Sequence, residues 1–163
     1  MPTDQPTTTT ASTSASPSLE TTPGDPPPLP APAVTVVGRT VRAFTPAALR
    51  SLERVERPYT VACASSERAR ARWTGAPVSA LLDAVEAPPD TTHLRLSSRD
   101  GYRVCVPVRD ALDGVVAYAR DGERLALTRP YATRFLAPDV DGARLVKGLV
   151  RVETLALAPD EDP

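Results

Sequence analysis

The stretch His93–Val108, HLRLSSRDGYRVCVPV, sets two runs of strand-type residues on either side of Asp100-Gly101. β-Branched and leucine residues that alternate with polar ones indicate half-buried strands, and Asp-Gly accepts the backbone angles of a tight hairpin turn. The pattern recurs in Val115–Thr128 around a second Asp-Gly pair, with strands expected over 115–119 and 125–128. Two successive hairpins predict a domain made largely of antiparallel strands.

Shorter patterns complete the expected secondary structure. Two strands around a II′ turn at Gly38-Arg39 are expected in Val34–Phe44, and further strands at Tyr59–Ala64, at Arg134–Ala137 and within Ala143–Leu157. Helices are expected to begin at Thr45-Pro46, to span Val78–Val85 and to form one turn at Arg109–Leu112. Seven or more strands with two or three short helices, and no regular alternation of the two, predict an α+β, mostly β fold.

The ends of the chain differ in composition from its centre. Residues 1–32 are dominated by Thr, Ser and Pro, which predicts a disordered tail because little apolar surface is available to offset the entropy of ordering. Residues 33–158 carry the regular patterns and have the length of one domain with one core. Residues 159–163, PDEDP, form a short acidic tail.

Charge and hydropathy narrow the classes of partner. All 19 basic residues lie between Ala33 and Ala158, whereas six of the 20 acidic residues lie in the two tails, so the central part has a net charge of +5. With 4% aromatic residues there are few stacking platforms, and no nucleic acid partner is expected.

No apolar run approaches the roughly 18 residues of a membrane span, and the first residues lack the features of a secretory signal. A cytoplasmic protein is expected, with a secreted stalk as the alternative.

Cys63 ends a strand-type run and is followed by a segment, expected to be a loop, that contains Arg68, Arg70 and Arg72. Three interpretations of this cysteine stay open: a buried packing residue, half of a disulfide with Cys105, or a thiolate that binds a metal. Neighbouring guanidinium groups or a metal would lower the pKa of the thiol and favour the third. Cys105 itself is expected to be a packing residue.

The sequence lacks the residues that several common kinds of active site require. The only histidine, His93, lies inside a strand pattern, and no CxxC pair is present, so a zinc site built from this chain alone is not expected. A nucleophile triad would need the same histidine, and no elbow-type glycines surround a serine or Cys63. Neither of the common glycine-rich phosphate loops occurs.

Four segments together resemble the molybdopterin-binding domain of the sulfite oxidase family. In chain order they are VACAS at Val61–Ser65, WTGAP at Trp73–Pro77 with Leu81-Leu82 after it, DGY at Asp100–Tyr102 ahead of VCVPV, and RFLAP at Arg134–Pro138 with GARLVK at Gly142–Lys147. Order and spacing agree with the family over about Val34–Leu157. The resemblance implies the family's mixed, β-rich fold.

The resemblance also implies two catalytic residues. Cys63 takes the position of the molybdenum ligand, where a thiolate is a suitably soft donor and the other sulfur ligands come from the pterin dithiolene. Tyr102 aligns with a tyrosine that in the family faces the metal's oxygen and the substrate. Its alternative role is that of a half-buried hairpin residue.

Four further residues are implied as cofactor-binding. Arg134, Arg144 and Lys147 fall where the family holds the pterin and its phosphate, and charge-assisted bonds to phosphate suit guanidinium groups. Asp100 joins them as part of the Asp-Gly-Tyr segment. Arg144 and Lys147 have the alternative of a solvated strand end.

The chain departs from the family in three places. Only the tail precedes Val34, where larger members have a segment with an arginine and a histidine for substrate and cofactor. The family's His-Gly pair appears as Arg129-Pro130, and the tryptophan after the lysine is Gly148. The last two replacements are expected to open the cofactor pocket.

Two functions from different classes follow. The first is a molybdopterin-dependent oxidoreductase in which molybdenum on Cys63 exchanges an oxo group with a small polar or anionic substrate, and electrons leave through a separate partner. The second is a cofactor-free binding or scaffold module that keeps the fold.

Overall fold

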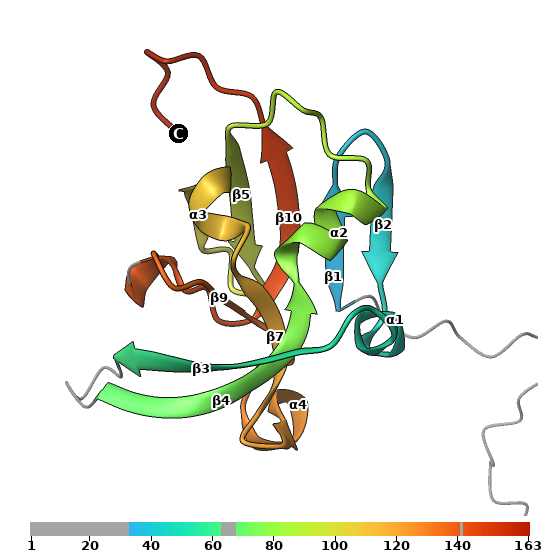
Figure 1. The fold of residues 1–163 in the computed structure, drawn as a ribbon, viewed down its shortest axis with the longest axis vertical. Coiled ribbons are helices and arrows are strands. Elements are labelled where there is room, and N and C mark those ends of the chain that lie inside the picture. The colour runs from blue at the N-terminus through green and yellow to red at the C-terminus, as the bar shows by residue number, and fades with distance from the viewer. Residues whose placement is uncertain (1–32, 63–67, 141) are drawn as a thin grey trace, which may run out of the picture.

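The structure is a computed structural model that describes residues 33–62, 68–140 and 142–163 (Figure 1). Within these ranges the chain forms a mixed, mostly β fold with ten strands and four short α-helices, so the expected fold class is confirmed and one helix more than expected is present. The strands are β1 (Val34–Val37), β2 (Val41–Phe44), β3 (Val55–Ala62), β4 (Arg68–Pro77), β5 (His93–Ser98), β6 (Arg103–Pro107), β7 (Val115–Arg120), β8 (Glu123–Arg124), β9 (Arg134–Leu136) and β10 (Leu149–Leu155). The helices are α1 (Pro46–Ser51), α2 (Val78–Ala84), α3 (Val108–Ala111) and α4 (Leu125–Thr128), with a 3-10 turn η1 (Gly142–Arg144).

The strands form two sheets. Sheet A has the order β2-β1-β10-β5-β6, and only β1 and β10 in it run parallel. Sheet B has the order β3-β4-β7-β8, and β9 pairs with β7 as well. In Figure 1 the strands of sheet A run up the view, whereas β3 and the first half of β4 run across it below. Because the two sheets cross, a single strand, β4, can run from sheet B toward sheet A.

Strand β4 bends where it passes from one part to the other. Its pairing with β7 shifts register between Thr74 and Gly75. A Cβ atom on Gly75 would lie 2.2 Å from the backbone oxygen of Val116, so only glycine permits this close approach. Beyond the bend, β4 leads through Pro77 into α2, whose apolar face packs on the inner face of sheet A.

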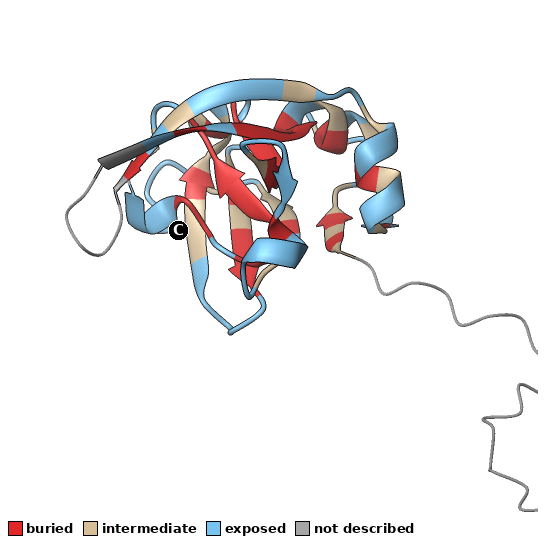
Figure 2. Cartoon of the chain, turned by 90° about the horizontal axis from the view of Figure 1, so that it is seen from below, coloured by how far each residue is buried: buried red, intermediate tan, exposed pale blue. Residues whose placement is uncertain are grey.

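The buried side chains form two clusters rather than the single core expected. Strand β7 contributes to both, because Val116 faces the larger cluster whereas Val115 and Ala117 face the smaller one. The larger cluster lies between sheet A, α2 and sheet B, and the smaller one lies on the other face of sheet B around Trp73. Figure 2 shows the buried residues gathered in the middle of the molecule, with β3 mostly exposed at its edge. Burial on both faces explains why β7 is a nearly continuous apolar run.

Three local expectations are corrected. The residues after Asp121-Gly122 form β8 and then α4, not a strand over 125–128: Leu125 is buried and Leu127 is 80% exposed, as on a helix, where residues two apart lie roughly 200° apart. The arginine segment lies in β4, not in a loop. The first two strands are joined by three residues, since Val37 pairs with Val41, and not by a two-residue II′ turn.

Other local expectations are confirmed. Helix α1 begins at Pro46, where the Thr45 hydroxyl accepts a hydrogen bond of 3.1 Å from the backbone N–H of Ala48. Helix α2 ends before Pro88-Pro89, and α3 is one turn. Asp121 and Gly122 both have positive φ, as the expected hairpin turn requires.

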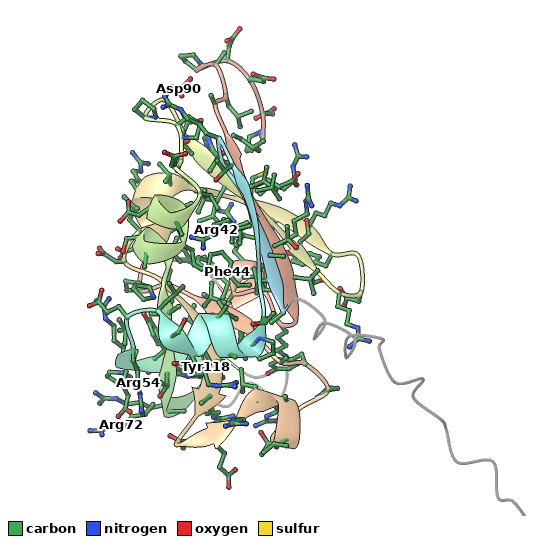
Figure 3. All side chains as sticks on the ribbon, turned by 90° about the vertical axis from the view of Figure 1, so that its right-hand side faces the viewer. Arg42, Phe44, Arg54, Arg72, Asp90 and Tyr118 are labelled. Atoms are coloured by element: carbon green, nitrogen blue, oxygen red, sulfur yellow. The ribbon has the colours of Figure 1, made fainter. Side chains whose placement is uncertain are left out.

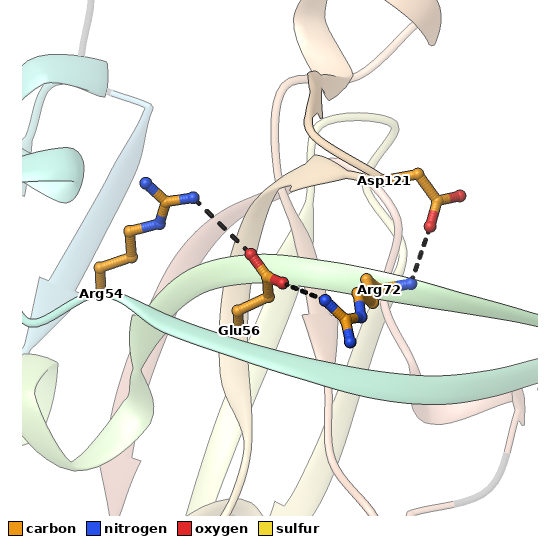
Figure 4. A network of polar contacts seen from close by, with 4 residues as sticks. All are labelled: Arg54, Glu56, Arg72 and Asp121. Carbon is orange, nitrogen blue, oxygen red and sulfur yellow. Dashed lines mark hydrogen bonds and ion pairs between the residues drawn. The ribbon is translucent and has the colours of Figure 1, made fainter.

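Arginine side chains take part in several contacts at the edges of both sheets. Arg42 on β2 lies over the ring of Phe44, with 5.6 Å between the guanidinium carbon and the ring centroid (Figure 3). Between β3 and β4, Glu56 pairs with Arg72 at 3.2 Å and with Arg54 at 3.7 Å (Figure 4). Exposed pairs of this kind each contribute only about 0–1 kcal/mol.

Candidate cofactor site

One hollow brings together residues from three separate segments. It has a volume of about 290 Å³ and opens between the β5–β6 hairpin, β9 and the segment from η1 to β10. We call it the Tyr102 hollow; its lining residues include four of the residues singled out in the sequence, namely Asp100, Tyr102, Arg134 and Lys147.

The β5–β6 turn is held by the Asp100 carboxylate. Its Oδ1 atom accepts hydrogen bonds from the Ser98 hydroxyl and, at 3.2 Å, from the backbone N–H of Tyr102. These two hydrogen bonds, that from Ser98 first, lower the pKa of Asp100 below its ordinary value because they favour the charged form. Asp100 therefore fixes the direction in which Tyr102 leaves the turn.

Tyr102 joins two sides of the hollow. Its hydroxyl donates a hydrogen bond of 3.0 Å to the backbone oxygen of Ala143 in η1, although the residue is 44% exposed. The phenolic oxygen keeps the capacity to accept a hydrogen bond. Tyr102 thus positions the η1 turn and presents one oxygen at the hollow.

Arg134 is the most buried charged residue of the site, at 6% exposure. It lies on β9, which the smaller hydrophobic cluster covers, and its guanidinium carbon is 5.5 Å from the centroid of the Trp73 ring. The Arg120 guanidinium lies over the same ring at 5.4 Å. Cation–π contacts of this kind stabilise partly desolvated arginines. Trp73, which belongs to one of the four segments, therefore supports the arginine that lines the hollow.

The two remaining cationic residues differ in position. Lys147 is exposed, forms a β-bridge with Arg134, and its side chain belongs to the lining of the hollow. Arg144 is exposed on η1 and is not among the lining residues. The structure brings Lys147 into the candidate site and leaves Arg144 at its outside.

A second hollow, which we call the Arg129 hollow, adjoins the first and shares Asp100 and Lys147 with it. Its volume is about 510 Å³, and it is lined by Arg99, Asp100, Arg129, Pro130, Tyr131, Lys147 and Gly148. The departures at 129, 130 and 148 were expected to open a pocket, whereas no role was predicted for Arg99, Arg129 or Tyr131. Gly148, in place of the family's tryptophan, is the departure that removes a large side chain, and no motif pointed to Arg99 or Tyr131.

The residues that the structure describes include one of the two cysteines, Cys105. Cys63, the expected metal ligand, lies outside them. Cys105 is a half-buried free cysteine on β6, so the structure does not support a disulfide that includes it. Among residues 33–62, 68–140 and 142–163, no three His, Cys, Asp or Glu residues gather as a metal site. His93 is a strand residue whose Nδ1 lies 3.0 Å from the Thr92 hydroxyl.

No described helix could cross a membrane, the longest of them, α2, having seven residues.

Comparisons with known proteins place this geometry in a family. No curated protein matches the sequence. The crystal structure of the sulfane dehydrogenase SoxCD from Paracoccus pantotrophus superimposes with a TM-score of 0.69 and 18% identity, over 78% of this chain and 39% of that one. At this identity the likeness concerns the fold, and this chain spans well under half of that protein's length. The family model of the oxidoreductase molybdopterin binding domain matches residues 33–161. The chain therefore belongs to the family of oxidoreductase molybdopterin-binding domains.

Proposed function

We propose that this domain binds a molybdopterin cofactor in the Tyr102 hollow and acts as a molybdenum-dependent oxidoreductase on a small polar or anionic substrate. One observation carries the proposal. Asp100 and Tyr102 from one motif, and Arg134 and Lys147 from another, line the same hollow. A cavity that is lined by residues from three separate segments is typical of a ligand-binding site.

The residues present fit such a ligand. The two adjoining hollows have volumes of about 290 and 510 Å³, in the range of small-molecule sites. Lys147 belongs to both, and Arg134, Arg99 and Arg129 add positive charge, which suits a ligand that carries a phosphate. Ser98 and Tyr102, which both carry hydroxyl groups, line the Tyr102 hollow.

The chain's own residues would orient and hold the ligand. When bound, the cofactor would supply the two-electron redox chemistry. Cys63 is proposed as its thiolate ligand, Lys147 and Arg134 as partners for its negative charge, and Tyr102 as the residue that presents a hydroxyl to the substrate. Electrons would leave through a separate protein, and a cytoplasmic location belongs to the same proposal.

A second function has one observation in its favour. Asp100 and Tyr102 already have hydrogen-bond partners within the chain, and Arg134 lies over Trp73. Side chains with internal partners can serve the fold alone, as in a binding or scaffold module without cofactor.

Molybdenum analysis separates these two functions. The full chain is produced in a host that synthesises the cofactor, purified, and analysed for metal and for released pterin. About one molybdenum per chain is the expected result for the oxidoreductase, and none for the scaffold module.

A matched pair of cysteine variants then tests the ligand. Cys63→Ser is expected to lose most of the molybdenum because a neutral hydroxyl replaces a thiolate donor. Cys105→Ser, on the exposed side of sheet A, is expected to retain it. Equal metal content in both variants would show that Cys63 is not the ligand.

A further inference from the structure

Strand β3 leaves one edge of sheet B open. It is the first strand in the order β3-β4-β7-β8, and within the described residues it pairs with β4 alone. It has eight residues, and its register with β4 is unbroken from Val55 to Ala62. An edge strand of this length presents a row of backbone groups with which a further strand can pair.

The backbone groups that face this open edge can be identified from Arg72, which lies opposite Pro58. The N–H of Arg72 donates to the Asp121 carboxylate at 2.9 Å, and its oxygen accepts from the Asp121 N–H at 2.7 Å (Figure 4). Because both backbone groups of Arg72 are directed to Asp121, Arg72 and Pro58 form a non-hydrogen-bonded pair, and the Pro58 oxygen points away from β4. Such pairs alternate along an antiparallel ladder, so Glu56 and Thr60 also direct their backbone groups outward.

The chain itself leaves these outward groups unpaired. The backbone groups of Glu56, Pro58 and Thr60 form no hydrogen bond across this edge with any residue in 33–62, 68–140 or 142–163, and all three residues are exposed. A hollow of about 400 Å³ lies beside the edge. It is lined by residues 57–60 of β3 and, facing them, by Ala137, Pro138, Val140 and Leu145. Space with a mostly apolar wall is therefore available next to the unpaired groups.

The side chains around β3 carry positive charge that the chain does not balance. A second hollow, of about 530 Å³, shares Arg57 and Pro58 with the first and is lined by Arg70 as well. Its two carboxylates already have partners, since Glu56 pairs with an arginine at 3.2 Å and Asp121 accepts a backbone hydrogen bond. Arg57 and Arg70 form no ion pair with any residue that the structure describes.

This charge decides between two kinds of strand that could pair here. A second copy of the chain, related by a two-fold axis, would bring its own arginines against Arg57 and Arg70, and like charges that face each other across strands are destabilising. A segment with acidic side chains would instead complement the charge of both arginines. Apolar side chains between the acidic ones would suit the wall formed by Val140 and Leu145.

We propose that the open edge of β3 is a docking site for an extended acidic segment of a partner protein, which pairs with β3 as an added strand. The backbone hydrogen bonds would supply affinity, and Arg57, Arg70 and the apolar wall would select the sequence. No residue of β3 lines the Tyr102 hollow or the Arg129 hollow, so the proposal does not depend on a bound cofactor.

The first experiment tests the charge of the segment. The probe is an eight-residue peptide, blocked at both ends, in which Glu and Val alternate, and its binding to the full chain is measured by calorimetry. The parent is expected to bind this peptide at least tenfold more tightly than the same peptide with Lys in place of Glu. Arg70→Gln is expected to weaken binding roughly two- to fivefold, as loss of one exposed ion pair does. Arg39→Gln, an exposed arginine between β1 and β2, is the control and is expected to bind as the parent does.

The second experiment tests the backbone pairing with a matched pair of variants. Thr60→Pro removes one outward N–H and keeps the bonds to β4, as Pro58 does, and is expected to weaken binding about tenfold. Thr60→Val keeps the N–H and is expected to bind as the parent does. Urea unfolding of both variants checks that they fold. A fully N-methylated form of the Glu-Val peptide, which keeps its charge but has no backbone N–H, is expected not to bind.

Hydrogen exchange locates the bound peptide on the chain. The amide protons of Glu56 and Thr60 are expected to exchange more slowly when the Glu-Val peptide is present. The proposal is overturned if the N-methylated peptide binds as tightly as the parent peptide, if folded Thr60→Pro matches Thr60→Val, or if the Lys-Val peptide binds equally well. Slow exchange of both amides without peptide, together with a dimer in sedimentation, would assign the edge to a second copy and also overturn it. If Thr60→Pro does not fold, the methylated peptide and the exchange rates decide.

Discussion

The two adjoining hollows differ in how their polar side chains are used. In the Tyr102 hollow, Asp100 accepts bonds within its own turn, Tyr102 donates to Ala143, and Arg134 lies over Trp73. In the Arg129 hollow, the lining cations have no ion-pair partner in the described part of the chain. The first set fixes the geometry of the site, and the second set is available to a ligand. Residues of the first kind should affect stability when changed, and residues of the second kind should affect binding.

Arg134→Ala is expected to have the largest effect on stability. It removes a buried side chain and its contact with the Trp73 ring, and a cavity of this kind costs about 2–4 kcal/mol of the free energy of unfolding. Arg129→Ala removes an exposed arginine and is expected to change the same quantity by less than about 0.5 kcal/mol. Urea unfolding of the two variants and the parent gives the comparison, and equal losses would remove the energetic difference between the hollows.

Tyr102→Phe is expected to have an intermediate effect. The variant loses the 3.0 Å hydrogen bond to Ala143, which at a partly exposed site is worth about 0.5–1 kcal/mol. Tyr131→Phe, in the other hollow, is the matched control and is expected to unfold at the parent's urea concentration. If Tyr102→Phe also unfolds there, the hydroxyl does not hold η1 in solution.

Asp100→Asn is expected to have the smallest effect, and one that depends on pH. Because the folded state lowers the pKa of Asp100, the carboxylate stabilises the fold above the ordinary carboxyl pKa, near 4, and this contribution is lost as the pH falls through the lower folded value. The parent is therefore expected to exceed the variant in thermal midpoint at pH 7 and to match it near pH 2.

An exposed carboxylate outside both hollows serves as the reference for that measurement. Asp90 lies in the loop before β5 (Figure 3), and Asp90→Asn is expected to follow the parent across the range. A constant gap between the parent and Asp100→Asn from pH 2 to pH 7 would mean that the amide differs from the carboxylate for a reason other than charge.

Local patterns predicted most of the secondary structure, and the errors have physical causes. The alternation of exposed Arg70 and Arg72 with buried Ala71 and Trp73 is the period of a strand, yet the density of arginine favoured a loop. Leu125 and Leu127 also lie two residues apart, which is the period of a strand. However, β8 ends after two residues, and only Leu125 reaches the smaller cluster. In both segments, the secondary structure depends on which part of the fold the side chains contact.

The candidate site was predictable only where motifs carried it. Asp100, Tyr102, Arg134 and Lys147 were selected from their motifs and line one hollow, and their roles in binding or catalysis stay predictions. Arg144 belongs to the same motif but lies outside the lining. Arg99 and Arg129 belong to no motif, and a single sequence does not reveal which cations share a cavity.

The sequence by itself determined the strand-rich class, the Asp-Gly turn, the start of α1 and the family, because each depends on residues close together in the chain or on a motif that is read directly. Only the tertiary structure decided that β7 is buried on both faces, that Gly75 admits the bend of β4, and that a vacant side-chain position at 148 lies between Arg99 and Tyr131. These features depend on contacts between segments far apart in sequence. Their energies are set by packing and by the distances between charges, neither of which is written in the order of residues.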